Sequence, residues 1–238
     1  MKPGRDMQFP KSDYKEYPKT LAKDDFWGQV RRTVYGKPVS EEQIRMIVDT
    51  IRDGLGLQSS DRLLDLACGN GALSQYFFDT CTELHGVDYS QYLIEVAREN
   101  FEAPPRFTFA CSDAASYVRA EADPTRFTKV LCYGSFSFFP AQDAVSVLAG
   151  LRERFTAVQT LYIGNLPDKD RADRFFPAGT DFAHQLDDHA SQIGIWRNPD
   201  EFAKLCASCG WHVSFRRMPA EFFGAHYRYD SILTPLAK

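Results

Sequence analysis

Short apolar runs alternate with amphipathic stretches along most of the chain, beginning near residue 40. The runs of strand length occupy residues 62–67, 84–87, 107–111, 129–133 and 158–164. Between them apolar side chains are spaced for one face of a helix, as at Leu148, Leu151 and Phe155. Strands separated by helices pair in parallel through right-handed crossovers. The pattern therefore predicts the doubly wound α/β class.

An amphipathic helix is predicted to lead into this core. Ser40 followed by Gln43 is a capping-box start, and apolar side chains follow at helical spacing. Gly54 and Gly56 supply a stop for this helix. A second helical pattern follows the first strand, in residues 73–77.

The C-terminal part is predicted to complete the sheet. Asn198 and Pro199 are typical of a helix start, and Gly210 is typical of a helix end. Residues 211–218 and 226–233 then alternate like two strands. We expect a mostly parallel seven-stranded sheet in which these two strands form an antiparallel hairpin at the edge.

Two segments lie outside the regular alternation. The N-terminal segment, residues 1–39, precedes a domain of residues 40–238, and its aromatic side chains between residues 14 and 27 are interpreted as a lid. The cap insertion, residues 165–197, is polar and rich in Phe, His and Trp. Structureless loops of this length are usually functional or disordered, and the aromatic content favours a small folded cap.

Composition narrows the possible partners. Apolar residues make up 44% of the 238 residues and charged residues 25%, which is ordinary for a globular protein. The formal net charge of −4 disfavours a strong grip on nucleic acid or on an anionic membrane. The apolar runs fall short of the roughly 20 residues of a membrane span, and residues 1–20 lack the apolar core of a secretory signal. We expect a cytoplasmic protein, monomeric or homodimeric, without nucleic-acid or membrane partners.

The cysteines predict no metal site. Six cysteines in a chain without an export signal are typical of buried thiols rather than of a disulfide framework. Cys206 and Cys209 form the only Cys-x-x-Cys pair, and no second pair or histidine stands at ligand spacing. We therefore expect no zinc and no other metal.

Three acidic residues recur one strand-plus-helix unit apart. Asp65 precedes the glycine-bearing loop that contains Gly69 and Gly71, Asp88 ends the second predicted strand, and Asp113 follows the third. The carboxyl ends of parallel strands are where open α/β sheets bind ligands. Asp88 or Asp113 taken alone is equally well explained as a helix cap. The recurrence favours a ligand site.

Two cofactors compete for such a site, a dinucleotide and S-adenosylmethionine. Both carry a ribose, whose hydroxyls Asp88 is placed to accept, so this residue does not separate them. Asp65 does, because a carboxylate would repel a pyrophosphate but would suit the ammonium of a methionine moiety. The spacing Gly69-x-Gly71-x-x-Ser74 also lacks the third glycine or alanine of the dinucleotide fingerprint. The residues favour S-adenosylmethionine.

The stretches LLDLACGNGALS, HGVDYSQYLIEVAREN and the SDA tripeptide resemble the successive motifs of class I, Rossmann-like S-adenosylmethionine-dependent methyltransferases. The first loop of that family reads E/D-x-G-x-G-x-G, so Asp65, Gly69 and Gly71 match, whereas Ala67 replaces the first glycine. The resemblance covers about residues 40–165 by motif. It implies the strand order 3-2-1-4-5-7-6, with the last strand antiparallel.

The resemblance also implies a role for each residue of the cofactor site. The methionine end would lie against Asp65 and the backbone of residues 69–71, and the ribose against Asp88. The adenine would lie between Asp113 with Ala114 and the ring of Tyr89. The full set of candidate cofactor residues is Asp65, Ala67, Gly69, Asn70, Gly71, Asp88, Tyr89, Asp113, Ala114 and Tyr133.

Candidates for the chemistry are fewer. A hydroxyl acceptor benefits from a general base, for which histidine is the usual choice. The cap insertion contains His184 and His189, and Tyr133 follows the fourth strand where the resemblance places both cofactor and acceptor. We take these three as the candidate catalytic residues. A solvated loop histidine and an aromatic wall remain the alternatives.

The predicted function is an S-adenosylmethionine-dependent methyltransferase acting on a small polar molecule. A sugar or a natural-product intermediate with an oxygen or nitrogen acceptor is expected, since the fourth strand ends in YGSFSFF and lacks an Asn-Pro-Pro-Tyr-like motif of DNA amino-methyltransferases. Two alternatives stay open: an NAD-dependent oxidoreductase, and a non-catalytic protein that binds an adenosyl ligand.

Overall fold

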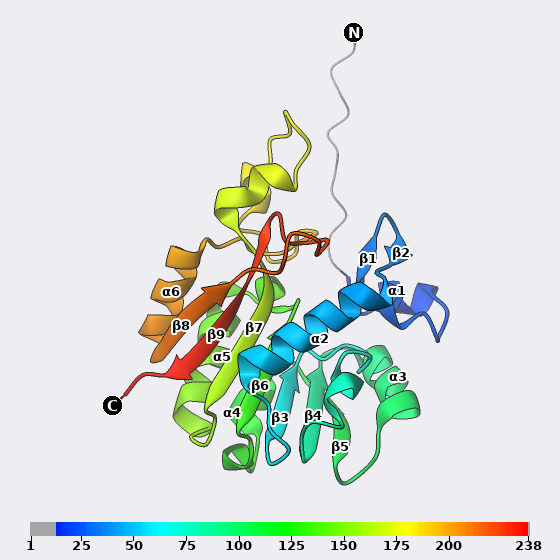
Figure 1. The fold of residues 1–238 in the computed structure, drawn as a ribbon, viewed down its shortest axis with the longest axis vertical. Coiled ribbons are helices and arrows are strands. Elements are labelled where there is room, and N and C mark those ends of the chain that lie inside the picture. Colours follow the sequence, from blue (N-terminus) through cyan, green and yellow to red (C-terminus); the bar gives the residue numbers. More distant parts are fainter. Residues whose placement is uncertain (1–12, 238) are drawn as a thin grey trace.

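A seven-stranded sheet lies at the centre of the structure, a computed structural model that describes residues 13–237 (Figure 1). Its strands are β3 (Arg62–Leu66), β4 (Glu83–Asp88), β5 (Phe107–Cys111), β6 (Lys129–Tyr133), β7 (Thr160–Pro167), β8 (Trp211–Arg216) and β9 (Arg228–Pro235). Their order is β5-β4-β3-β6-β7-β9-β8, and only β9 pairs antiparallel, with both β7 and β8. The predicted fold class, strand order and C-terminal hairpin are confirmed.

Helices cover both faces of the sheet because side chains alternate between the faces along each strand. On one face Leu63 and Leu131 pack against α2 (Glu41–Leu55). On the opposite face Leu64 and Val130 belong to a cluster with α4, α5 and α6. These helices are α4 (Ala114–Ala120), α5 (Ala141–Arg154) and α6 (Pro199–Ser208), and α3 (Gln91–Phe101) packs beside β5.

The predicted caps are largely present. Ser40 accepts a hydrogen bond from the Gln43 N–H at the start of α2, and Asn198 forms a full capping box with Glu201 at the start of α6. The Gln43 side chain, however, bonds to the backbone of residues 221 and 223 instead of closing the predicted box at Ser40. Gln43 therefore connects α2 to the loop between β8 and β9.

Two helical predictions need correction. Residues 74–77 form only one turn of 3-10 helix, η2 (Ser74–Phe77). Ser74 and Phe77, three residues apart, are both buried, and a spacing of three residues per turn places them on the same side. Gly54 does not stop α2: it is a helical residue, and the left-handed cap is Gly56, with φ of 57°. Gly54 is required for packing, because a Cβ there would lie 2.4 Å from the ring of Tyr162.

The two segments outside the regular pattern both lie above the carboxyl ends of β3 to β7 (Figure 1). The described part of the N-terminal segment holds η1 (Tyr17–Thr20), α1 (Phe26–Gln29) and the small hairpin of β1 (Thr33–Val34) and β2 (Lys37–Pro38). The segment after β7 holds η5 (Lys169–Arg174) and η6 (Ala183–Gln185). Residues 1–12 of the predicted lid lie outside the described residues.

The cap insertion begins later than the predicted residue 165. Strand β7 continues to Pro167, because it resumes pairing with β9 after a bulge, at Leu166 with Tyr229. Asn165 occupies this bulge with φ of 63°. The irregular segment is anchored by a cluster around the fully buried Trp196, whose indole contacts Phe175, Phe176 and Tyr227. A small folded cap is therefore present.

Within residues 13–237, no helix combines the length and the apolar character that crossing a membrane requires.

Replacing Gly54 with alanine tests its packing role. Alanine normally favours a helix over glycine by roughly 1 kcal/mol, whereas overpacking costs roughly 1–3 kcal/mol. Because the new methyl group meets Tyr162, we expect Gly54→Ala to lower the free energy of unfolding in urea by about 1–2 kcal/mol. Asp49→Ala, at an exposed position of α2, should change it by less than about 0.5 kcal/mol. A stabilised Gly54→Ala variant would contradict the packing role.

Candidate active site

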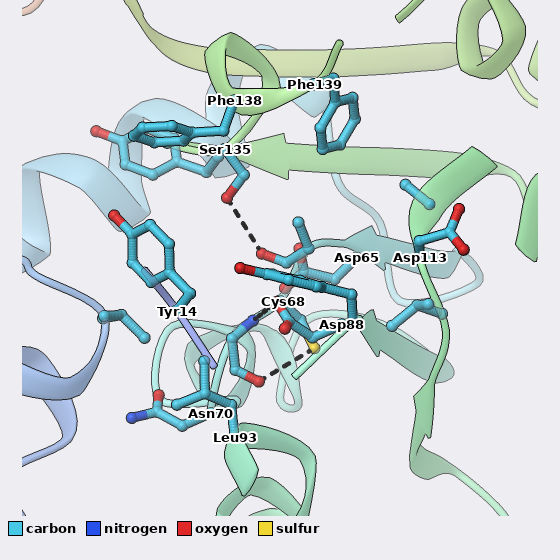
Figure 2. A pocket seen from close by; sticks show the side chains of 18 of the residues that line it. Tyr14, Asp65, Cys68, Asn70, Asp88, Leu93, Asp113, Ser135, Phe138 and Phe139 are labelled. Carbon is cyan, nitrogen blue, oxygen red and sulfur yellow. Dashed lines mark hydrogen bonds between the residues drawn. The ribbon is translucent and has the colours of Figure 1, made fainter. Parts of the chain in front are cut away.

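A cavity of about 420 Å³ lies over the carboxyl ends of β3, β4, β5 and β6 (Figure 2). It is lined by all the candidate cofactor residues except Gly71, and by side chains of the N-terminal segment and the loop after β6. Three residues distant in sequence, Tyr14, Trp27 and His189, also line it. The topology thus brings the predicted site residues to one place. Their roles remain predictions.

The loop between β3 and η2 has an unusual backbone. Ala67, Gly69 and Gly71 have φ of 57°, 62° and 76°, all in the left-handed region that favours glycine. A residue with a Cβ costs roughly 1–2 kcal/mol in that region. Ala67, which stands where the family pattern has glycine, therefore adopts a backbone conformation that favours glycine. The substitution introduces local backbone strain at this position.

The two glycines serve different contacts. A Cβ on Gly69 would lie 2.8 Å from Cγ1 of Val30, so Gly69 admits the N-terminal segment. A Cβ on Gly71 would lie 3.0 Å from the ring of Phe109, so Gly71 admits the neighbouring core. Gly71 is the one candidate cofactor residue that the structure places away from the cavity.

Asp88 holds the loop in place. Its Oδ2 accepts the N–H of Gly69 and its Oδ1 the N–H of Ser90, each at 2.9 Å. The carboxyl is only 5% exposed, and burial raises its pKa to about 6 against the opposing effect of these bonds. Each carboxylate oxygen has a second acceptor position. Asp88 is not the helix cap of the alternative interpretation, because the N-cap of α3 is Ser90; it holds the turn before that helix and keeps acceptor capacity towards the cavity.

Asp65 is the more isolated carboxylate. Its Oδ2 accepts the hydroxyl of Ser74 at 2.7 Å, it is 3% exposed, and no Lys or Arg of residues 13–237 lies within ion-pair distance of it. Burial raises the pKa of Asp65 to about 7, with the Ser74 bond and the more distant Arg32 acting in the opposite direction. A buried carboxyl of this kind favours a cationic ligand.

Asp113 has the helix-cap position that the alternative interpretation gave it. It is the N-cap of α4, and its Oδ1 accepts the N–H of Ser116 at 2.8 Å. The residue is exposed and borders the cavity together with Ala114. In the view of Figure 2 it lies across the cavity from Tyr14 and Phe138. Tyr89, 41% exposed, stands at the rim with Lys15 5.2 Å from its ring centre.

Asn70 connects the loop to the N-terminal segment. Its Nδ2 donates to the carbonyl of Phe26 at 2.8 Å and to Oε1 of Gln29 at 2.9 Å. Gln29 is fully buried and in turn donates to the carbonyls of Ala22 and Lys23. The polar atoms of the Asn70 side chain are thus used within the protein, which anchors the segment that the sequence predicted as a lid.

The three candidate catalytic residues have different positions. Tyr133 is buried in the cavity wall, its hydroxyl has no hydrogen-bond partner among the described residues, and burial raises its pKa above the usual value. His189 is exposed at the rim, and His184 is exposed but does not line the cavity. The structure thus brings His189 and Tyr133 to the site and leaves His184 outside it.

Sequence reasoning missed Arg32. Its guanidinium lies in the cavity, 5.2 Å from the ring centre of Tyr133 and 5.6 Å from that of Trp27. Arg32 belongs to an irregular stretch before the first predicted helix, and no motif or periodicity marks it. The loop after β6 also contributes Phe138 and Phe139 to the cavity lining. The one sequence signal for these two residues was the aromatic character of the loop.

Among residues 13–237 no three His, Cys, Asp or Glu side chains are grouped so as to hold a metal ion. All six cysteines are free thiols, and five of them are buried or partly buried.

Comparison with known sequences identifies a domain family. Residues 63–156 match the family described as methyltransferase domain. The chain is 27% identical over 118 residues to the uncharacterized methyltransferase C1347.09 of Schizosaccharomyces pombe, a match covering 46% of this chain and 40% of the relative. A second S. pombe protein, the uncharacterized methyltransferase C70.08c, is 44% identical over 45 residues, 19% of this chain and 17% of the relative. The chain thus matches less than half the length of either relative.

Solved structures resemble the whole fold. The DhpI complex with SAM and HEP superposes with a TM-score of 0.62 at 14% identity, covering 93% of this chain and 94% of that one. Magnesium protoporphyrin IX methyltransferase from Synechocystis PCC 6803 with bound SAH gives 0.59 at 17% identity, covering 89% and 93%. The fold is that of class I, Rossmann-like S-adenosylmethionine-dependent methyltransferases, and residues 63–156 match the methyltransferase-domain family. The predicted resemblance is confirmed.

The raised pKa of Asp65 makes the unliganded protein less stable as the pH rises. The folded-state pKa of about 7 exceeds the ordinary aspartate pKa of 3.8. The stability that the protonated Asp65 contributes is therefore fully present below pH 3.8 and is lost as the pH rises through 7. Asp65→Asn removes this dependence. We expect the melting temperature of the variant, relative to wild type, to rise by several degrees between pH 4 and 8, since 1 kcal/mol corresponds to roughly 2–4 °C at this size.

The exposed Asp173→Asn is the control and should show no such trend. A constant difference between Asp65→Asn and wild type across this pH range would mean that Asp65 is ionised throughout and has no raised pKa.

Proposed function

We propose that the protein transfers the methyl group of S-adenosylmethionine to a small polar acceptor. The observation that carries this proposal is the pair of buried carboxylates, Asp65 and Asp88, at the ends of adjacent strands in one cavity. The fold, the methyltransferase domain and the solved neighbours with bound SAM or SAH support the same conclusion.

The residues present fit this cofactor. Asp65, buried without a cation within ion-pair distance among the described residues, suits the ammonium of the methionine moiety. Asp88 has acceptor capacity left for ribose hydroxyls after bonding Gly69 and Ser90. Ala114 and Ala115 offer an apolar surface near β5 for the adenine. S-adenosylmethionine supplies a sulfonium-activated methyl group when bound.

A dinucleotide fits less well. Its pyrophosphate would approach the backbone of the glycine loop, where Asp65 and Asp88 both present negative charge. Gly71, which a dinucleotide fingerprint would use for close approach, is already packed against Phe109 and Ala97. The oxidoreductase alternative is therefore disfavoured.

The protein's part in the chemistry is to orient the acceptor and to exclude water. Phe138 packs edge-on against Tyr14 with ring centres 5.6 Å apart, which joins the N-terminal segment to the loop after β6 on one side of the cavity (Figure 2). His189 at the rim is the proposed general base for a hydroxyl acceptor, with Tyr133 as a wall. The acceptor is proposed to be of sugar or natural-product type, with an oxygen or nitrogen nucleophile.

Ligand-induced stabilisation tests the cofactor. We expect S-adenosylmethionine and S-adenosylhomocysteine to raise the melting temperature at pH 8, and NAD and NADP at millimolar concentration to leave it unchanged. Asp65→Asn should weaken S-adenosylhomocysteine about tenfold or more, as for loss of a charged partner, and 5′-methylthioadenosine by less than about threefold, because the latter lacks the amino-acid group. Stabilisation by NAD alone would favour the oxidoreductase.

Release of S-adenosylhomocysteine in the presence of a panel of acceptors separates an enzyme from a non-catalytic binding protein. With a hydroxyl acceptor from this panel, His189→Gln should lower kcat by about 10²–10⁴-fold, the usual contribution of a general base, and leave S-adenosylhomocysteine affinity unchanged. His212→Gln, on the exposed side of β8, is the matched control. An unchanged kcat in His189→Gln would exclude it as the base.

A further inference from the structure

We propose that the methyl acceptor carries an anionic group, a carboxylate or a phosphate-type group, and that Arg32 binds it. This inference rests on the proposed methyltransferase function and adds to it the chemical class of the acceptor. It starts from the position of one cationic side chain that the catalytic proposal does not use.

Arg32 is held in the cavity by its aromatic neighbours. The guanidinium lies over the rings of Trp27 and Tyr133, and its Nη2 would lie 3.6 Å from a Cβ on Gly134. These contacts fix the faces of the guanidinium plane and leave its N–H donors free. No side-chain hydrogen bond and no ion pair of Arg32 joins it to another residue in the described part of the chain.

A partly buried arginine without a carboxylate partner destabilises the folded protein unless a ligand supplies the negative charge. Burial lowers the pKa of Arg32, and the like charge of Arg228 acts in the same direction, whereas Asp65 and the tyrosines act in the opposite one. Surface arginines of this chain commonly meet a carboxylate, as Arg45 meets Glu41 and Arg216 meets Asp53. Arg32 is partly buried and has none within 4 Å among residues 13–237.

Among the described residues, Arg32 is the one Lys or Arg side chain that lines the cavity. The carboxylates Asp65, Asp88 and Asp113 lie at or just past the carboxyl ends of β3, β4 and β5, where the adenosyl part is proposed to bind. Arg32 lies instead against the end of β6. The side of the cavity next to β6 therefore favours an anionic acceptor over a cationic one.

The same chemistry would also suit the carboxylate of the cofactor's amino-acid end. The acceptor is favoured because Arg32 lies beside Tyr133 and Gly134 at the end of β6, whereas the glycine loop follows β3. A guanidinium binds a carboxylate or a phosphate in a bidentate manner.

The test uses the full chain saturated with S-adenosylhomocysteine. Calorimetric titration with benzoate, phenyl phosphate and the neutral benzamide should show at least tenfold tighter binding of one of the two anions than of the amide. Arg32→Met should abolish this preference, Arg32→Lys should retain part of it, and Arg45→Met, an exposed arginine of α2, should leave it unchanged.

Each outcome is decisive. Equal binding of benzamide and the anions, or binding of none of them up to about 10 mM, would overturn the proposal. So would a preference that persists in both Arg32 variants. If Arg32→Met weakens S-adenosylhomocysteine more than tenfold but 5′-methylthioadenosine by less than threefold, Arg32 binds the cofactor's carboxylate and the acceptor assignment is wrong. Failure of wild type to bind S-adenosylhomocysteine would instead contradict the proposed function.

Discussion

The hydrogen bond from the Gly69 N–H to the Asp88 carboxylate continues the connection between the loop after β3 and the end of β4, next to the backbone bond from the Cys68 N–H to the Val87 carbonyl. The loop carries three left-handed residues in five positions, a backbone that local sterics alone would not select. Because Asp88 also accepts the Ser90 N–H, a single carboxylate sets the turn after β4 and the loop beside it. Removing it would leave two inward-facing N–H groups without acceptors, at roughly 1–3 kcal/mol for each. Asp88 consequently stabilises the local backbone and lines the cavity at the same time.

The loop in turn positions the N-terminal segment. Asn70 projects from it to bond Phe26 and Gln29, and Gly69 leaves space for Val30. Trp27 and Arg32 reach the cavity only because residues 26–30 are fixed in this way. The N-terminal segment therefore depends on the same loop that shapes the cofactor half, although it belongs to none of the strands of the central sheet. Because the N-terminal segment is hydrogen-bonded to this loop, the order of the segment and the order of the loop are coupled.

The sequence allowed much of the fold to be predicted, because parallel strands buried on both faces leave apolar runs and their helices leave caps. The acids at the ends of β3, β4 and β5 were predictable for the same reason: topology fixes that edge. Gly54 was misinterpreted because a glycine chosen for contact with Tyr162 has no local signature. Arg32 was missed, and the hydrogen bonds of Asn70 to the N-terminal segment were not foreseen, for a related reason: their partners come from segments distant in sequence.

The site keeps charges that the protein itself does not neutralise. Burial raises the pKa values of Asp65 and Asp88 and lowers that of Arg32, so each of these groups opposes the folded state of the unliganded protein. Asp65 and Arg32 influence each other electrostatically, yet they are separated by more than the 4 Å of an ion pair. If Asp65 and Arg32 formed an ion pair, the unliganded protein would be more stable, but neither charge would be available to a ligand. Because the opposite charges are kept apart, each remains available for the ligand groups proposed above: the carboxylates for an ammonium and hydroxyls, and the guanidinium for an anion. A ligand that brought both would recover in binding what the fold loses in stability.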